Sequence, residues 1–236
     1  MQQQLPLNDG RSIPQLGFGL WQVPADQTAR VVREGLAAGY RLIDAAAIYG
    51  NESGLGEGLR TTDIPRDQIF VTTKVWNDHH GFDAARRAAD ESLKRIGIDY
   101  LDCLLIHWPC PDHDRYVETW KALIDLRAEG RVKSIGVSNF MAPHLERLIG
   151  ETGVTPVLNQ IELHPRLVQA DLRALHRKLG IVTQSWTPLG QGKAFTAPAV
   201  QAAAPLGDLS AYAAIVTDTQ TIAGTGDLVA AEKRMT

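Results

Sequence analysis

The chain has 236 residues, of which 44% are hydrophobic and 22% are charged, and its formal net charge at pH 7 is −3. These are ordinary values for a globular protein, and a chain of this length can bury one large core. The 24 basic residues are balanced by 27 acidic ones, which leaves no basic footprint for nucleic acid. No apolar run is long enough to span a membrane. We therefore expect neither a nucleic-acid nor a membrane partner.

The first residues and the cysteines bear on location. Residues 1–6 lack the charged and apolar regions of a secretory signal. Cys103 and Cys110 lie on either side of an apolar run, which suits reduced thiols better than a disulfide framework. We expect a cytoplasmic protein.

Short apolar runs alternate with amphipathic stretches along the chain. Residues 2–7 and 12–14, on either side of Asn8-Asp9-Gly10, predict a β-hairpin with an Asp-Gly turn. After it come nearly continuous apolar runs, which are typical of strands buried on both faces. These predicted strands are residues 16–19, 41–44, 69–74, 101–107, 132–137, 157–161 and 181–186.

The stretches between these runs predict helices. In residues 82–96 the apolar positions recur every three or four residues, and several such stretches end on a glycine, as C-caps do. The cap candidates are Gly39, Gly97, Gly130 and Gly180. Alternating strands and helices at this spacing predict a (β/α)8 TIM barrel with an N-terminal β-hairpin. No Gly-x-Gly-x-x-Gly turn follows the first strand, so an open dinucleotide-binding sheet is the weaker interpretation.

We expect one barrel domain over residues 1–236, with the hairpin in 1–15, βα units one to seven in 16–206, and an incomplete eighth unit in 207–236. Residues 197–206 predict helix seven and residues 226–229 the eighth strand, which leaves little chain for an eighth helix. If the eighth strand does not form, the open edges favour a dimer; otherwise we expect a monomer.

Polar or aromatic residues stand at the ends of the predicted strands, where barrel enzymes carry their active sites. They are Trp21, Asp44, Lys74, His107, Ser138, Asn139, Gln160 and Trp186. Each alone has an ordinary explanation: Asp44 or Ser138 as a helix cap, and Lys74 as a side chain that reaches solvent. Their convergence on one barrel mouth favours a functional site.

Tyr49 follows Asp44 closely and gives this cluster a definite chemistry. A free phenol, with a pKa of about 10, is a poor acid at neutral pH. An ammonium beside it lowers that pKa, and a carboxylate keeps the ammonium charged, so we predict that Lys74 and Asp44 lower the pKa of Tyr49. His107 can position a carbonyl oxygen against the phenol. The set is suited to protonating a carbonyl oxygen while a hydride arrives at its carbon.

The other residues of the mouth suit a nicotinamide and a substrate. Ser138, Asn139 and Gln160 offer donors and acceptors for a carboxamide, and Trp186 offers a flat face for stacking. We expect an apolar substrate pocket here, and we assign no metal ligands. The residues predicted to line this pocket are Trp21, Trp76 and Trp108.

Six segments resemble the aldo-keto reductase family, and in particular its bacterial branch typified by 2,5-diketo-D-gluconate reductases. The resemblance covers roughly residues 5–206. The segments are Asp44-Ala-Ala-Ala-Ile-Tyr49-Gly-Asn-Glu52, Thr73-Lys-Val-Trp76, Leu105-Ile-His-Trp-Pro109, Gly136-Val-Ser-Asn-Phe140, Asn159-Gln-Ile-Glu-Leu-His-Pro165 and Pro188-Leu189-Gly190-Gln191-Gly192.

The resemblance implies an NADPH-dependent barrel, with NADH not excluded, that reduces small aldehydes, ketones or keto-sugars such as 2,5-diketo-gluconate. It makes Tyr49 the general acid, Asp44 and Lys74 its tuning pair, and His107 the residue that orients the substrate. It assigns the cofactor to Ser138, Asn139, Gln160, Trp186, Leu189 and Gly190. The family's segment for the 2′-phosphate is at best faintly copied here, which leaves Lys233 and Arg234 as the cations for that phosphate. Beyond residue 206 the family pattern fades, and we expect a truncated or altered end.

Two other functions stay open. One is a truncated, weakly active or inactive protein of the same fold that binds the cofactor or a partner. The other is a lyase that forms a Schiff base through Lys74, which leaves Tyr49, Gln160 and Trp186 without a role.

Overall fold

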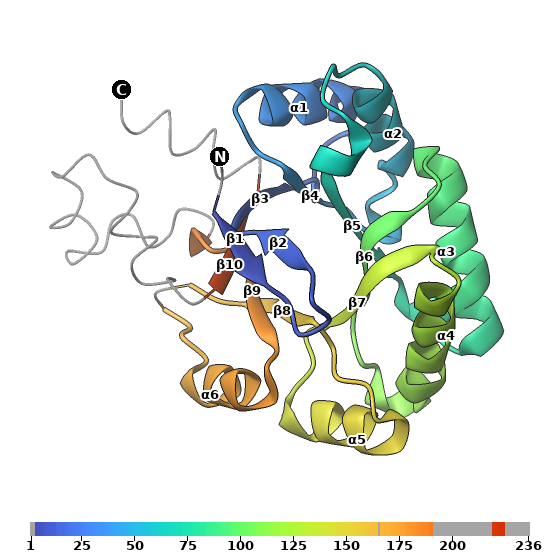
Figure 1. Cartoon of the computed structure of the whole chain (residues 1–236), viewed down its shortest axis with the longest axis vertical. Coiled ribbons are helices and arrows are strands. Elements are labelled where there is room, and N and C mark those ends of the chain that lie inside the picture. Colours follow the sequence, from blue (N-terminus) through green and yellow to red (C-terminus); the bar gives the residue numbers. More distant parts are fainter. Residues whose placement is uncertain (1–2, 165, 191–218, 225–236) are drawn as a thin grey trace, which may run out of the picture.

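The computed structural model describes residues 3–164 and 166–190, and the backbone of 219–224. Within these ranges eight strands form a closed parallel barrel in the order β10-β3-β4-β5-β6-β7-β8-β9, and the helices lie along its outside from the α1 side to the α6 side (Figure 1). The barrel strands are β3 Leu16–Gly19, β4 Leu42–Asp44, β5 Phe70–Val75, β6 Leu101–Ile106, β7 Val132–Ser138, β8 Leu158–Glu162, β9 Val182–Trp186 and β10 Thr219–Gly224. The predicted barrel is confirmed.

Among the described residues each α-helix follows one barrel strand in the chain, from α1 after β3 to α6 after β8. The helices are α1 Ala25–Ala37, α2 Glu52–Arg60, α3 Phe82–Ile96, α4 Tyr116–Ala128, α5 Ala142–Thr152 and α6 Ala170–Leu179, with short 3-10 turns η1 Ala47–Tyr49, η2 Arg66–Gln68, η3 Asn77–His79 and η4 Pro111–His113. Gly97 and Gly180 end α3 and α6 in the left-handed conformation, as their positions in the sequence predict.

The eighth strand is not where we predicted it. Residues 226–229 lie outside the described residues, and the strand that closes the barrel is β10, which pairs with both β3 and β9. Our search for a continuous apolar run missed this Thr- and Ala-containing segment. We expected a dimer only if the eighth strand did not form and left β3 and β9 unpaired. Because β10 pairs with both, this condition is not met. Residues 197–206, the predicted helix seven, also lie outside the described part.

The barrel has two apolar layers, which the alternation of side chains along its strands creates. Outward residues such as Ile43 pack under the helices in the main core. Inward residues such as Leu42 and Leu105 pack against Leu7 and Ile13, which flank the turn of the N-terminal hairpin. The predicted hairpin is confirmed: β1 Gln4–Pro6 pairs antiparallel with β2 Ser12–Pro14 and lies across one barrel opening (Figure 1).

The hairpin is fastened to the barrel by polar contacts as well. The Asn8 side-chain amide donates to the carbonyls of Pro156 and Gly180, and the Ser134 hydroxyl donates to Asp9 over 2.7 Å. The hairpin therefore closes the end of the barrel where the strands begin, which leaves the carboxyl ends of the strands as the open mouth.

Candidate active site

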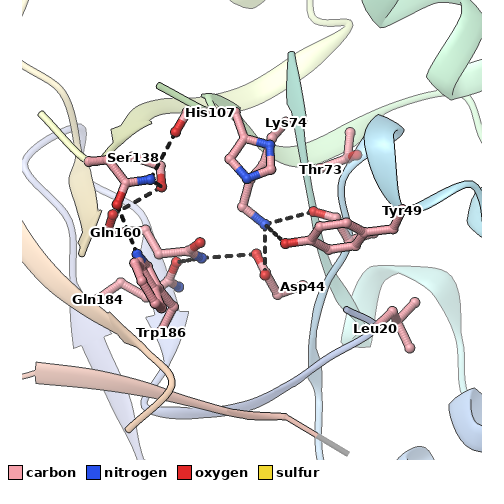
Figure 2. Close-up of polar contacts among 12 residues, drawn as sticks. Leu20, Asp44, Tyr49, Thr73, Lys74, His107, Ser138, Gln160, Gln184 and Trp186 are labelled. Atoms are coloured by element: carbon pink, nitrogen blue, oxygen red, sulfur yellow. Dashed lines mark hydrogen bonds and ion pairs between the residues drawn. The ribbon is translucent and has the colours of Figure 1, made fainter. Parts of the chain in front are cut away.

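Asp44, Tyr49 and Lys74 meet at the carboxyl ends of β4 and β5. Lys74 Nζ donates to Asp44 Oδ2 over 2.7 Å, to the Ala45 carbonyl over 2.8 Å and to the Tyr49 hydroxyl over 3.4 Å (Figure 2). The Lys74 side chain is 0% exposed and the Asp44 side chain 6%. A charge buried this deeply needs an opposite charge and full hydrogen bonding, and Lys74 has both.

The charge state of Lys74 follows from its partners. Burial tends to lower its pKa, but Asp44 and then Tyr49 favour the ammonium strongly enough that the pKa lies above its ordinary value. Lys74 is therefore positively charged at neutral pH. An amine must lose its proton before it attacks a carbonyl, so this charge state disfavours the Schiff-base lyase.

The predicted lowering of the Tyr49 pKa is wrong. Burial raises the pKa of the phenol above its ordinary value, Lys74 opposes this only in part, and Asp44 adds to it. Our prediction weighed the ammonium and left out the loss of water around the phenol. The result is a hydroxyl that keeps its proton at neutral pH.

His107 lies beside the phenol. Its ring centre is 6.0 Å from that of Tyr49 and 5.0 Å from that of Trp76, edge to face in both cases. Burial, and then the charge of Lys74, lower its pKa to about 3. His107 is therefore neutral at physiological pH, and its Nδ1 has no hydrogen-bond partner among the described residues.

The residues predicted to hold a carboxamide form a connected group on the other side of the mouth. Asn139 donates from Nδ2 to the Ser138 hydroxyl over 3.0 Å and to the His107 carbonyl over 3.1 Å, and its Oδ1 accepts from Trp186 Nε1 over 3.0 Å. Asn139 has a positive φ of 63°, a conformation that asparagine tolerates better than most residues. The turn after β7 thereby holds the indole of Trp186 by its edge.

Gln160 joins this group to the acid cluster. Its Nε2 donates to Asp44 Oδ1 over 3.0 Å, and its backbone carbonyl accepts from the Ser138 hydroxyl over 3.0 Å. Gln160 is 2% exposed. The described structure thus brings Asp44, Tyr49, Lys74, Gln160 and Ser138 into one hydrogen-bonded set (Figure 2).

The remaining predicted residues fall into three groups. Trp21 and Trp108, just after β3 and β6, are 50% and 41% exposed, which is unusual for large apolar side chains. Leu189 and Gly190 lie in the turn after β9. Lys233 and Arg234 lie outside the described residues.

Three residues in or beside the site had no role in our sequence interpretation. Glu52 is 1% exposed and accepts from the Thr73 hydroxyl and from Arg95 Nε, each over 2.7 Å, which fastens the start of α2 beside β5. Asn51 donates to the carbonyls of Leu20 and Val23 and so holds the loop that carries Trp21. Gln184 contacts Gln160. The sequence feature that could have identified Gln184 is a glutamine inside a strand of otherwise buried residues.

Comparison with known proteins assigns the family. The sequence model described as "Aldo/keto reductase family" matches residues 15–207. The chain belongs to the aldo/keto reductase family. As a member it is an oxidoreductase, and the reaction of the family, carbonyl reduction, agrees with the chemistry of the cluster. No helix in the described part is both long and apolar enough to cross a bilayer.

Individual relatives agree with this assignment. An aldo-keto reductase of Mycolicibacterium smegmatis is 52% identical over 85% of this chain and 73% of its own length. Methylglyoxal reductase DkgA of Escherichia coli K12 is 50% identical over 80% of this chain and 68% of its own. The similarity to the 2,5-diketo-D-gluconate reductase branch is thereby confirmed.

Solved structures share the fold. An aldo/keto reductase from Brucella melitensis has a TM-score of 0.90 and 48% identity, covering 94% of this chain and 88% of its own. A point mutant of Gox0644, solved in complex with NADPH, has a TM-score of 0.90 and 43% identity, covering 95% and 83%.

Proposed function

We propose that this aldo/keto reductase uses NADPH to reduce small aldehydes and ketones, with Tyr49 as the proton donor. The observation that carries the proposal is the position of Lys74 Nζ, which donates both to Asp44 Oδ2 and to the Tyr49 hydroxyl. This arrangement gives a buried phenol a cation at the point where negative charge develops as its proton leaves.

The residues of the mouth fit a nicotinamide. Ser138, Asn139 and Gln160 together present hydroxyl and amide groups of the kind that bind a carboxamide, and the Trp186 indole is held at its edge by Asn139. The NADPH complex of the related Gox0644 mutant supports the choice of cofactor. When bound, the reduced nicotinamide supplies the hydride that the carbonyl carbon accepts.

The protein residues supply orientation and the proton. The neutral His107 presents an N–H group that can donate to the substrate oxygen and hold it against the Tyr49 hydroxyl. Tyr49 keeps its proton until the oxygen gains negative charge, because burial raises the pKa of the phenol. Lys74, which Asp44 keeps charged, then stabilises the phenolate that the transfer leaves.

The substrate class rests on the aromatic mouth and on one relative. The exposed Trp21 and Trp108, with Trp76 packed on His107, offer apolar walls to a small substrate. The similarity to methylglyoxal reductase DkgA makes a short 2-oxoaldehyde the first substrate to assay, with 2,5-diketo-gluconate as the keto-sugar to compare.

The test is Tyr49→Phe, assayed by the carbonyl-dependent loss of NADPH absorbance. We expect turnover to fall by about 10²–10⁴-fold, the usual effect of removing a general acid, while NADPH still quenches the tryptophan fluorescence. Tyr40→Phe is the matched control, because Tyr40 packs on Phe18 near the other end of β4. Unchanged turnover in Tyr49→Phe, or an equal loss in Tyr40→Phe, refutes the assigned acid. A wild type that binds NADPH tightly but turns over no carbonyl supports a binding protein instead.

A further inference from the structure

Gln184 is a polar side chain inside the barrel for which the proposed reaction has no use. It lies on β9, where its Cα pairs in register with that of Gln160 on β8, and it is 0% exposed. Its Oε1 accepts from Gln160 Nε2 over 2.5 Å (Figure 2). A buried amide is costly unless it is hydrogen-bonded, so this contact calls for a physical explanation.

Charge fixes the direction of every hydrogen bond in the chain of contacts that leads to Gln184. Lys74 is an ammonium and can only donate, so Asp44 is a carboxylate and can only accept. The Gln160 atom that faces Asp44 Oδ1 must therefore be the amide nitrogen. The Gln184 atom that faces this same nitrogen must then be an oxygen.

This order leaves Gln160 a single role toward a ligand. Both hydrogens of its Nε2 have acceptors, one on Asp44 and one on Gln184. Toward the cofactor it can offer its carbonyl oxygen, which is an acceptor. Without Gln184 one amide hydrogen loses its partner, and one of the two bonds that fix the amide orientation is gone.

We propose that Gln184 is a positioning residue: it holds the Gln160 amide so that its nitrogen faces Asp44 and its oxygen is presented to the cofactor carboxamide. This inference rests on the proposed function, because it assumes that NADPH binds at Gln160. Gln184 acts through Gln160 and touches neither reactant.

The test measures the NADPH dissociation constant directly, by quenching of tryptophan fluorescence, alongside kcat and KM. Gln184→Met has a similar size but no acceptor oxygen, and we expect it to weaken NADPH binding about ten-fold, the usual effect of one lost buried hydrogen bond. Gln184→Glu carries an acceptor oxygen in either protonation state, and we expect it to restore the affinity to within about three-fold. Gln184→Leu repeats the test with another shape should methionine disturb the barrel.

Thr72→Val is the matched control. Thr72 is 0% exposed on β5, and its hydroxyl has no hydrogen-bond partner among the described residues, so valine removes a buried polar atom without breaking a bond. A double-mutant cycle separates positioning from packing. In a Gln160→Met background, Gln184→Met should change the dissociation constant less than about two-fold, because the group it positions is gone.

Weaker NADPH binding in Gln184→Met, recovery in Gln184→Glu and no further loss in the double variant support the inference. An affinity in Gln184→Met or Gln184→Leu within about three-fold of wild type overturns it, as does an equal loss in Thr72→Val. If wild type binds NADPH but reduces no carbonyl, the proposed function fails while the role of Gln184 in binding is still decided. A wild type that binds no NADPH overturns both.

Discussion

Asp44→Asn tests the energetic role of the buried ion pair. The variant removes the charge that faces Lys74 and changes the shape of the side chain very little. Two unit charges 2.7 Å apart attract by about 6 kcal/mol at an effective dielectric constant of about 20. The Asn side chain and the Ala45 carbonyl can still accept hydrogen bonds from Lys74, so part of this energy is kept.

The cost of burying Lys74 as an unpaired charge has an upper limit, because Lys74 can give up its proton. For a lysine with an unfolded pKa of about 10.4, deprotonation costs about 1.36 kcal/mol per pH unit, which is about 4.6 kcal/mol at pH 7 and about 2 kcal/mol at pH 9. We therefore expect Asp44→Asn to lower the free energy of unfolding by about 3–5 kcal/mol at pH 7. At pH 9 the loss should be smaller than at pH 7 by up to about 2.6 kcal/mol, the difference between these two limits.

The pH dependence has a definite sign. In wild type the folded pKa of Lys74 lies above its ordinary value, so the stabilisation is complete below that ordinary value and is lost as the pH rises through the folded pKa. In Asp44→Asn the main group that opposes burial is gone and only Tyr49 still favours the ammonium, so we expect burial to move the pKa of Lys74 below its ordinary value. In this variant Lys74 then binds its proton more tightly in the unfolded state than in the folded state. The stability of Asp44→Asn relative to wild type therefore rises with pH.

Urea unfolding at pH 7 and pH 9 measures both effects, with m-values compared to check that the same transition is followed. The control is Asp44→Asn combined with Lys74→Met, which removes both charges of this pair and should recover most of the loss at pH 7. A loss below about 1 kcal/mol in Asp44→Asn at pH 7, or one that stays constant to pH 9, would falsify the reasoning.

Two further variants test the fold. Gly56→Ala would place a Cβ 1.9 Å from the Ile96 carbonyl oxygen where α2 meets α3, and we expect a loss of at least about 2 kcal/mol in urea unfolding; Gly150→Ala, on α5 with open space around it, should be neutral or stabilising, and equal effects in the two would contradict the argument. His176 is buried with its pKa lowered to about 4. Wild type should therefore lose stability as the pH falls from about 6.5 toward 4, and His176→Gln should show a shallower loss in urea midpoints across that range; parallel curves would count against this.

Most of the barrel could be predicted from the sequence, because most of its strands are marked by a local run of apolar residues. Continuous apolar runs marked the strands from β3 to β9, and glycines such as Gly97 and Gly180 marked helix ends. Asp44, Lys74 and Gln160 could be grouped without coordinates, because barrel closure brings the carboxyl ends of all strands to one mouth.

What could not be predicted depends on long-range pairing. β10 lacks a continuous apolar run, and its neighbours β3 and β9 define it as a strand. The pKa of Tyr49 depends on the balance between burial and the charge of Lys74, and the spacing of residues reveals neither. The role of Gln184 requires knowing that its side chain meets Gln160, which depends on strand register.

The N-terminal hairpin has a practical consequence for engineering. Leu7 and Ile13 of the hairpin close the amino-terminal end of the barrel, and Asn8 and Asp9 are hydrogen-bonded to its rim. The residues that close the barrel therefore lie at the opposite end from the tryptophans around the active site. Loops around those tryptophans can therefore be exchanged to change selectivity without disturbing the seal. Shortening the hairpin, in contrast, would expose Leu42 and Leu105 to water and destabilise the barrel, although no residue of the active site would have been changed.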